Sequence, residues 1–298
     1  MGNALAGVGQ IDASRQSYLR AIELNPSYSA ALNDLSVLEA NAGRMDHSFN
    51  WGKRAFQLAP NLGVSWYHLA TSLMMLDEAS GERWLRAGIA RIPAGDYAAA
   101  RLQYLLACIE YINGQSAAAM ERMRKLAADH PRNPEVRVIL TELAVYTGAA
   151  DAPERVDQAL KVGPGARSGL LAYTPRTLRA FLWLQAGDRD KARPLIDAAL
   201  AENRAALEKE DRNSSIPHEN AALHLMLGDR TAALASLEAA VSSGFLDVGL
   251  LKVNPLMAPL ANEPRFRQVV DRIERDLREM RSRVDLREFD ELAKVGLL

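Results

Sequence analysis

Apolar residues recur at spacings of three and four along most of the chain, which is the rhythm of an amphipathic α-helix. Two clear examples are YSAALNDLSVLEAN, residues 28–41, and WYHLATSLMML, residues 66–76. No segment shows the two-residue alternation of a half-buried strand. The pattern therefore predicts an all-α protein.

These helical segments repeat with a fixed period. GQIDASRQSYLRAIELNP begins at Gly9, and GRMDHSFNWGKRAFQLAP begins 34 residues later at Gly43. Five pairs of matching residues share this shift: Gly9 and Gly43, Ile11 and Met45, Ser14 and Ser48, Ala21 and Ala55, and Pro26 and Pro60. Further copies carry Gly114, Gly187 and Gly228, and a weaker one carries Gly148. A period of this length indicates an array of repeated helical units.

Each unit predicts two antiparallel helices, which we call helix A and helix B. The repeated glycine lies between them, because glycine adopts the positive φ that ends a helix without steric cost. The small residue five positions later, such as Ala119 after Gly114, allows close helix packing. Asn133-Pro134 and Thr174-Pro175 each place a polar cap before a proline, which predicts a helix start.

The repeats resemble the tetratricopeptide repeat, a 34-residue helix-turn-helix unit. The residues that stand where that pattern expects them are Trp66, Leu69, Gly9, Gly43, Tyr18, Ala21, Ala55, Pro26 and Pro60. The resemblance implies a right-handed superhelix, an α-solenoid of paired antiparallel helices. The chain departs from the pattern at Asp77, which replaces the turn glycine of the third unit, before Pro93, where one residue is missing, and in DAPERVDQALKVGPGARSG, residues 151–169.

The expected organisation is a series of units followed by a C-terminal helical cap. It has a partial unit at 1–28, units at 29–62, 63–99 and 100–133, a degenerate unit at 134–172, a long-helix unit at 173–213, a unit at 214–245 and the cap at 246–298. Within the cap, residues 264–284 are expected to form an amphipathic helix over the last unit. Counted from Pro26, the first unit lacks the start of its helix A. We therefore expect residues 1–28 to continue an upstream repeat or domain, and this end to fray or to pair with a second copy.

The C-terminal part carries a second resemblance. SGF at residues 243–245, followed by a helix, by NPLMAPLANEPRF at 254–266 and by a last long helix, is similar to the end of repeat regions in multidomain bacterial signalling proteins. These include serine/threonine kinases, adenylyl cyclases and winged-helix regulators with TolB-like domains. The resemblance implies a docking or sensing arm.

The charge and composition of the chain disfavour some classes of binding partner. The net charge is −1, so the whole chain exerts no long-range attraction on nucleic acid or anionic lipid. The single Cys108 cannot form an internal disulfide, and no secretory signal or apolar run long enough to span a membrane is present. We predict a cytoplasmic protein, or a periplasmic one if it belongs to a membrane-anchored regulator.

Four segments suggest chemistry that their context disfavours. His218 and His224 in PHENAALH are six residues apart, which places them on different helix faces and argues against zinc. GPGARSG at 163–169 lacks the preceding strand of a phosphate loop and is interpreted as a linker. Cys108 is interpreted as a buried thiol. The seven arginines between Arg265 and Arg283 alternate with acidic residues, as on a solvated helix face. No cofactor, metal or enzymatic activity is predicted.

The concave face of such a superhelix predicts where a partner binds. The fifth, ninth and twelfth positions of each helix A supply an apolar, tyrosine-rich surface, with Tyr67, Tyr104 and Tyr111 as anchors beside Val37, and Asn33, Thr71 and Glu142 as polar contacts. The alternative is that the later helices bury these tyrosines. These positions lack the Lys and Arg with which some family members hold acidic chaperone C-termini, which argues against a cochaperone.

The predicted function is a protein-protein interaction module, a scaffold that binds a polypeptide within a bacterial signalling protein. The alternative is the regulatory arm of a kinase, of a cyclase or of a winged-helix regulator. A homodimer through the heptad-like face of Ile273, Leu277, Met280 and Val284 is a further interpretation.

Overall fold

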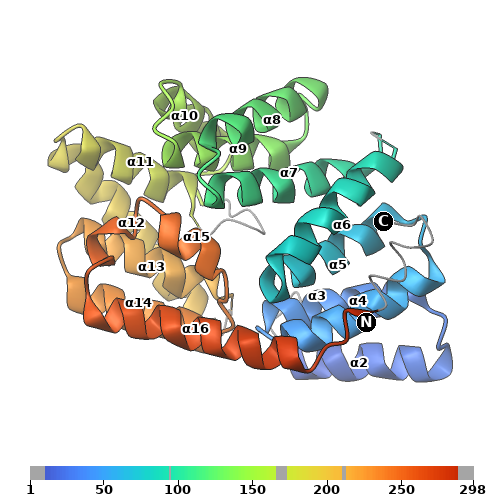
Figure 1. Ribbon diagram of the computed structural model, residues 1–298. Helices are drawn as coiled ribbons and strands as arrows, with labels where there is room; N and C mark the ends of the chain where they lie inside the picture. Colours follow the sequence, from blue (N-terminus) through green and yellow to red (C-terminus); the bar gives the residue numbers. More distant parts are fainter. Residues whose placement is uncertain (1–10, 94, 166–172, 210–212, 288–298) are drawn as a thin grey trace. The chain divides into compact units, whose positions relative to one another are not determined.

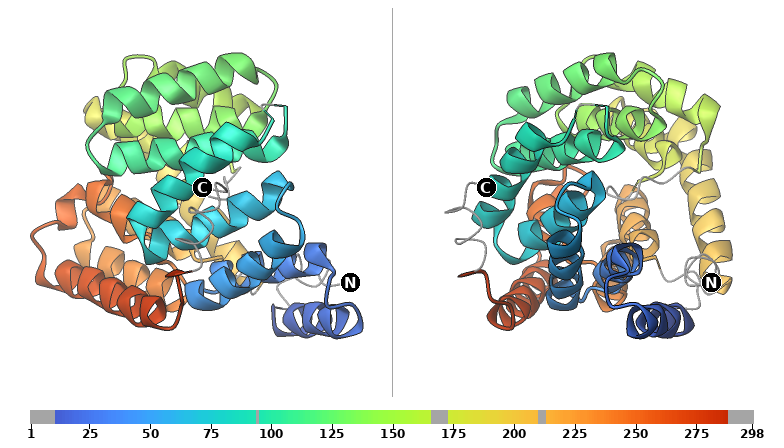
Figure 2. Two further views of the ribbon diagram at one scale, coloured as in Figure 1. Left: turned by 45° about the vertical axis from the view of Figure 1, so that its right-hand side comes forward. Right: turned by 90° about the vertical axis from the view of Figure 1, so that its right-hand side faces the viewer.

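A computed structural model describes residues 11–93, 95–165, 173–209 and 213–287, and all regular elements within these ranges are helices (Figures 1 and 2). The elements are α2 (Ile11–Leu24), α3 (Ser29–Asn41), α4 (Met45–Leu58), α5 (Gly63–Leu76), α6 (Glu78–Arg91), α7 (Tyr97–Ile112), α8 (Ser116–Asp129), α9 (Pro134–Tyr146), α10 (Ala152–Val162), α11 (Pro175–Gln185), α12 (Arg189–Glu208), α13 (Ser215–Met226), α14 (Arg230–Ser242), α15 (Val248–Val253), the 3₁₀ turn η1 (Ala258–Leu260) and α16 (Pro264–Ser282). The all-α prediction is confirmed.

The predicted helix ends are confirmed by the backbone. Gly43 and Gly114, which follow α3 and α7, have φ values of 71° and 77°. The side chain of Asn133 accepts a hydrogen bond from the N–H of Val136, and that of Thr174 accepts one from the N–H of Thr177, at the starts of α9 and α11. Where glycine is missing, Asp77 accepts a hydrogen bond from the Ser80 N–H (3.2 Å) and caps α6.

Five of the helices B carry the small residue that allows the close packing predicted from the repeat. All five such side chains are buried, namely Ser14, Ser48, Ala119, Ala192 and Ala233. The Ser48 hydroxyl also lies 3.2 Å from the Ser36 hydroxyl and 2.7 Å from the Ser72 hydroxyl, which links α4 to α3 and to α5. A larger side chain at these positions would push neighbouring helices apart.

Helices contact their neighbours in sequence, as in a repeat array. Five of the helices A contact the helix B that follows them, as α3 contacts α4 and α13 contacts α14. Helices A of consecutive repeats also contact one another, as α3 contacts α5, α9 contacts α11 and α11 contacts α13. This arrangement lines up the helix A side chains of consecutive units.

The chain forms two compact units. Unit 1 comprises residues 1–109 and 272–298, and unit 2 comprises residues 110–271. The core of unit 1 contains Phe56, Trp66 and Trp84, whose two indole rings stack at 4.3 Å. Their N–H groups donate to the carbonyls of Pro60 and Trp66. Tryptophan is therefore buried here without an unsatisfied donor.

The C-terminal helix differs from the expectation. Arg265 at its start pairs with Glu238 of α14 (2.8 Å), as expected of a helix over the last unit. From Arg272 onward, however, α16 belongs to unit 1. There Ile273, Leu277, Met280 and Val284 are buried, so this face is not exposed to a second copy of the chain. The sequence pattern predicts this helix but does not predict the surface against which it packs.

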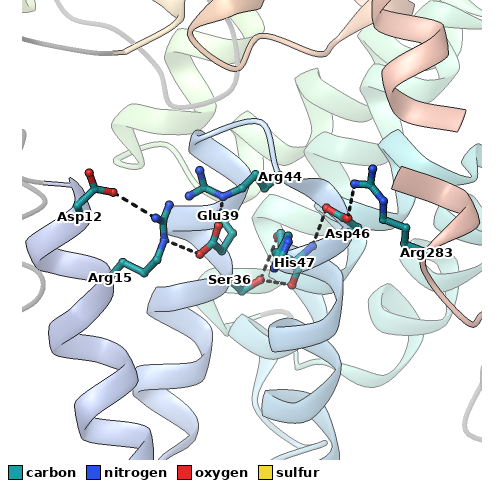
Figure 3. A network of polar contacts seen from close by, with 9 residues as sticks. Asp12, Arg15, Ser36, Glu39, Arg44, Asp46, His47 and Arg283 are labelled. Atoms are coloured by element: carbon teal, nitrogen blue, oxygen red, sulfur yellow. Dashed lines mark hydrogen bonds and ion pairs between the residues drawn. The ribbon is translucent and has the colours of Figure 1, made fainter. Parts of the chain in front are cut away.

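Ion pairs join the ends of several elements in unit 1 (Figure 3). Arg15 of α2 donates to Asp12 and to Glu39 of α3 (2.9 Å), and Glu39 also accepts from Arg44 at the start of α4. Arg283, just beyond α16, donates to Asp46 of α4 (3.2 Å). The buried carboxylate of Glu39 thus accepts from two arginines, and that of Asp46 accepts from Arg283 and from the N–H of His47 (3.0 Å).

Two expectations lie wholly or partly outside the described residues. These are the behaviour of residues 1–10 at the N-terminus and the linker interpretation of residues 166–169. The degenerate stretch before that linker nevertheless forms α10. In the described ranges, no helix is both long and apolar enough to cross a membrane.

Candidate functional site

The seven residues predicted to bind a partner fall into two groups. Asn33, Val37, Tyr67, Thr71 and Tyr104 lie in unit 1, on α3, α5 and α7. Tyr111 and Glu142 lie in unit 2, on α7 and α9. The two groups are described separately.

In unit 1 most of the predicted side chains are covered. Tyr104 is 2% exposed and Tyr67 9%, whereas Val37 is 36% exposed. The Asn33 amide donates to the Ser65 hydroxyl (3.3 Å), and the Thr71 hydroxyl donates to the carbonyl of Tyr67 (3.1 Å). These two polar groups therefore connect α3 to α5 and stabilise α5 itself.

The exposed part of this surface includes residues that the sequence interpretation missed. Arg101 of α7 lies over the ring of Tyr67 (4.9 Å) and over the ring of Tyr97 (4.5 Å). Tyr97 is 60% exposed, and Val64, one turn before Tyr67 on α5, is 39% exposed. We call Val37, Val64, Tyr67, Tyr97 and Arg101 the tyrosine–arginine face. It combines exposed apolar side chains with an arginine that lies over two tyrosine rings.

The missed residues have a simple explanation. The predicted unit 100–133 starts at residue 100, whereas its helix A, α7, starts at Tyr97. Counting positions from residue 100 left the first turn of α7 out of the surface. The spacing of Tyr97 and Arg101, which lie four residues apart on one helix face, is the signal that could have found them.

The tyrosine–arginine face carries one formally charged residue, Arg101. Arg101 is the only formally charged residue of α5 and of the part of α7 that belongs to unit 1. Burial and then the charge of Arg101 lower the pKa of His68 to about 4, so this imidazole is neutral at neutral pH.

In unit 2 the two predicted residues are enclosed. The Tyr111 hydroxyl donates to the carbonyl of Val253 (3.1 Å), and its ring lies 5.9 Å from that of Tyr146. Glu142 has no exposed surface, and its Oε1 accepts from the N–H of Tyr173 (3.2 Å). Neither side chain presents its polar group on the surface.

Beside Glu142 lies a buried polar cluster centred on Glu219 of α13. Glu219 Oε1 accepts from the Thr174 N–H, the Thr174 hydroxyl and the Thr177 hydroxyl, each at 2.7 Å. Its Oε2 accepts from the amide of Asn203 (3.0 Å). The Asn254 amide donates to the Tyr173 hydroxyl (2.8 Å). The cluster holds the start of α11 against α12 and α13.

His218 adjoins this cluster. Its ring stacks between those of Tyr173 (5.2 Å) and Phe245 (4.4 Å), and neither ring nitrogen has a hydrogen-bond partner among the described residues. Burial lowers the pKa of His218 to about 3. In the described part of the chain, no three His, Cys, Asp or Glu side chains are grouped to hold a metal ion. The segment PHENAALH therefore supplies packing and hydrogen bonds here.

Comparison with known proteins shows which solved structures share this fold. No protein-family model matches the chain, and no curated protein matches its sequence significantly. Among solved structures, a tetratricopeptide repeat protein from Parabacteroides merdae is similar with a TM-score of 0.51 and 13% identity over 92% of this chain and 96% of its own.

Two further solved structures are similar at the same level. A human IFIT1 dimer with PPP-AAAA has a TM-score of 0.53 and 15% identity over 92% of this chain and 70% of its own. The APC/C hetero-tetramer Cut9-Hcn1 has a TM-score of 0.50 and 14% identity over 91% of this chain and 48% of its own. At such identities the likeness concerns the fold alone. The fold is that of a tetratricopeptide-repeat α-solenoid.

Proposed function

We propose that the protein is a non-enzymatic scaffold that binds a polypeptide partner through the tyrosine–arginine face of unit 1. The observation that carries this proposal is the exposed Tyr97 ring stacked on Arg101, with Val64 and Val37 exposed on the neighbouring helices A. Aromatic residues and arginine dominate the energetics of protein interfaces, because they offer large contact area at low entropic cost. The helix-pair fold supports this role by holding the face on rigid elements.

The buried predicted residues keep an indirect role in this proposal. The Tyr67 ring lies against the Arg101 guanidinium, Asn33 joins α3 to α5, and the Thr71 hydroxyl bonds within α5. Tyr104 is buried one turn beyond Arg101 on α7, whereas Tyr111 and Glu142 lie in unit 2, outside this face. Direct contacts with a partner come from Val37, Val64, Tyr97 and Arg101.

We further propose a bacterial signalling context, supported by the resemblance of the C-terminal segment. The residues of that segment pack tightly within unit 2: Phe245 stacks on His218, Asn254 binds Tyr173, and Met257 and Leu260 are buried. The alternative, a regulatory arm of a kinase, cyclase or winged-helix regulator, would be recognised by the coding sequence upstream of Met1. Either compartment, cytoplasm or periplasm, fits these proposals.

Photocrosslinking followed by affinity measurement tests the binding proposal. A photoreactive phenylalanine analogue replaces Tyr97 in the native host, and a matched variant carries it at Leu207, which is exposed on α12. We expect a polypeptide adduct at position 97 that is absent at position 207. With the captured polypeptide purified, Tyr97→Ala should weaken binding at least tenfold, about 1.4 kcal/mol, and Leu207→Ala should leave it unchanged.

Three outcomes would contradict the proposal. Adducts of equal yield at both positions would show non-specific contact. An RNA adduct at position 97 would replace the polypeptide partner with a nucleic acid. Unchanged affinity of the Tyr97→Ala variant would remove the tyrosine–arginine face from the interface.

A further inference from the structure

Two buried carboxyl groups hold the start of α11 from opposite neighbours. Glu142 of α9 accepts from the N–H of Tyr173 (3.2 Å), and Glu219 of α13 accepts from the N–H of the next residue, Thr174 (2.7 Å). Both side chains are fully buried. Since α11 contacts both α9 and α13, the two acids connect three consecutive helices A.

The two acids have unequal surroundings. Glu219 accepts four hydrogen bonds, which use both of its oxygens, as suits an ionised carboxylate. Glu142 accepts only the Tyr173 bond at Oε1, and its Oε2 is buried without a partner among the described residues. An ionised carboxylate so poorly solvated is costly, whereas a neutral acid is far less so.

The groups around Glu142 offer it no positive charge within the described residues. Glu219, Tyr173 and the neutral His218 lie in this cluster. Five arginines of the neighbouring helices pair with other acids: Arg122 with Glu110, Arg124 and Arg155 with Asp151, Arg176 with Glu202, and Arg179 with Asp157. Burial, and then the nearby charge of Glu219, raise the pKa of Glu142, and the Tyr173 N–H opposes them.

We propose that Glu142 is a neutral acid at neutral pH while Glu219 is a carboxylate, and that the pair is a pH-responsive lock on the start of α11. One negative charge is compatible with the donors that surround the pair. A second one would have no counter-charge in this buried cluster and would repel the first. Ionisation of Glu142 at alkaline pH therefore loosens the contact of α9 with α11. This inference does not depend on partner binding in unit 1.

The sign of the pH effect follows from proton linkage. The folded state keeps a proton on Glu142 above the ordinary glutamate value of 4.5, and the unfolded state releases it. Stability therefore falls as pH rises from that value toward the folded pKa. The unfolding equilibrium constant rises by up to tenfold per pH unit relative to a variant that does not titrate there.

Urea unfolding between pH 5 and pH 9 tests the lock in the full chain. Glu142→Gln mimics the neutral acid, so the ratio of wild-type to E142Q unfolding constants should rise with pH. Glu219→Gln removes the charged acceptor and should raise the unfolding constant at pH 7 by about 10- to 100-fold. Glu154→Gln, on the exposed surface of α10, is the matched control and should follow the wild type at every pH.

A spectroscopic measurement reads the protonation state directly. At pH 7 the wild type should show the infrared carbonyl stretch of a protonated carboxylic acid, and E142Q should lack it. Parallel pH curves for the wild type and E142Q, or no such infrared band in the wild type, would overturn the proposal.

Discussion

His218 is a residue whose contribution depends on staying uncharged. It lies between the rings of Tyr173 and Phe245 in a fully buried position, and burial holds its pKa at about 3. An unfolded chain binds a proton at this position below the ordinary value of 6.5, whereas the folded chain does not. His218 therefore makes the protein less stable as pH falls from about 6.5 toward 3.

Replacing His218 with phenylalanine should remove this effect and keep the aromatic stack. We expect the His218→Phe variant to gain stability over the wild type as pH falls from 6.5 to 4, by up to about 1.4 kcal/mol per pH unit. Urea unfolding followed by circular dichroism at several pH values measures the difference. His224→Phe, on the partly exposed side of the same helix, is the control. A constant difference between wild type and His218→Phe would show that His218 does not titrate in this way.

At the scale of single residues, only part of the candidate site could be predicted from the sequence. The repeat count correctly placed Asn33, Tyr67 and Thr71 on helices A of unit 1, because helical periodicity fixes which residues share a face. Whether a tyrosine at such a position is exposed depends on how closely the next helix packs, which no local pattern records. Tyr104 is therefore buried while Tyr97, outside the counted positions, is exposed. The bonding of Glu219 was beyond prediction for the same reason, since its partners lie up to 45 residues away in sequence.

At the scale of elements, most helix ends follow from local chemistry. Glycines with positive φ, capping side chains and prolines act within a few residues, so the sequence alone predicts them. The position of α16 was harder, because an amphipathic pattern shows that a helix has a buried face but not what buries it. The apolar residues from Ile273 to Val284 are buried in unit 1, and the start of the helix pairs with α14 of unit 2.

The end of α16 offers a test of what holds an element in place. Arg283, half exposed, pairs with Asp46, whereas Ile273 has no exposed surface. Without Arg283, Asp46 still accepts from the N–H of His47, so this ion pair with a half-exposed arginine contributes little, whereas truncation of a buried isoleucine costs about 2–5 kcal/mol. We therefore expect Ile273→Ala to lower the free energy of unfolding far more than Arg283→Ala. Thermal and urea unfolding measure both, and equal losses would indicate that the ion pair is the principal contact.

At the scale of the whole molecule, a repeat array distributes stability among neighbouring helices. A helix with neighbours on several sides opens only when those contacts break, and a helix with one neighbour opens more easily. In the described residues, α13 contacts α11, α12 and α14 and carries the buried Glu219, whereas α2 contacts α3. The partial burial of Ile11 and Leu19 on α2 agrees with this difference.

Amide hydrogen exchange should therefore separate the two helices. We expect weak protection over Ile11–Leu24 and strong protection over Ser215–Met226, because local opening of α2 breaks few contacts while opening of α13 disrupts the Glu219 cluster. Mass spectrometry of peptides from both helices at neutral pH measures the protection. The experiment is repeated at several protein concentrations, since pairing of the N-terminal unit between two copies would raise the protection of α2 as concentration increases. Equal protection of α2 and α13 in a dilute monomeric sample would contradict the contact argument, and would mean that α2 has support beyond the described residues.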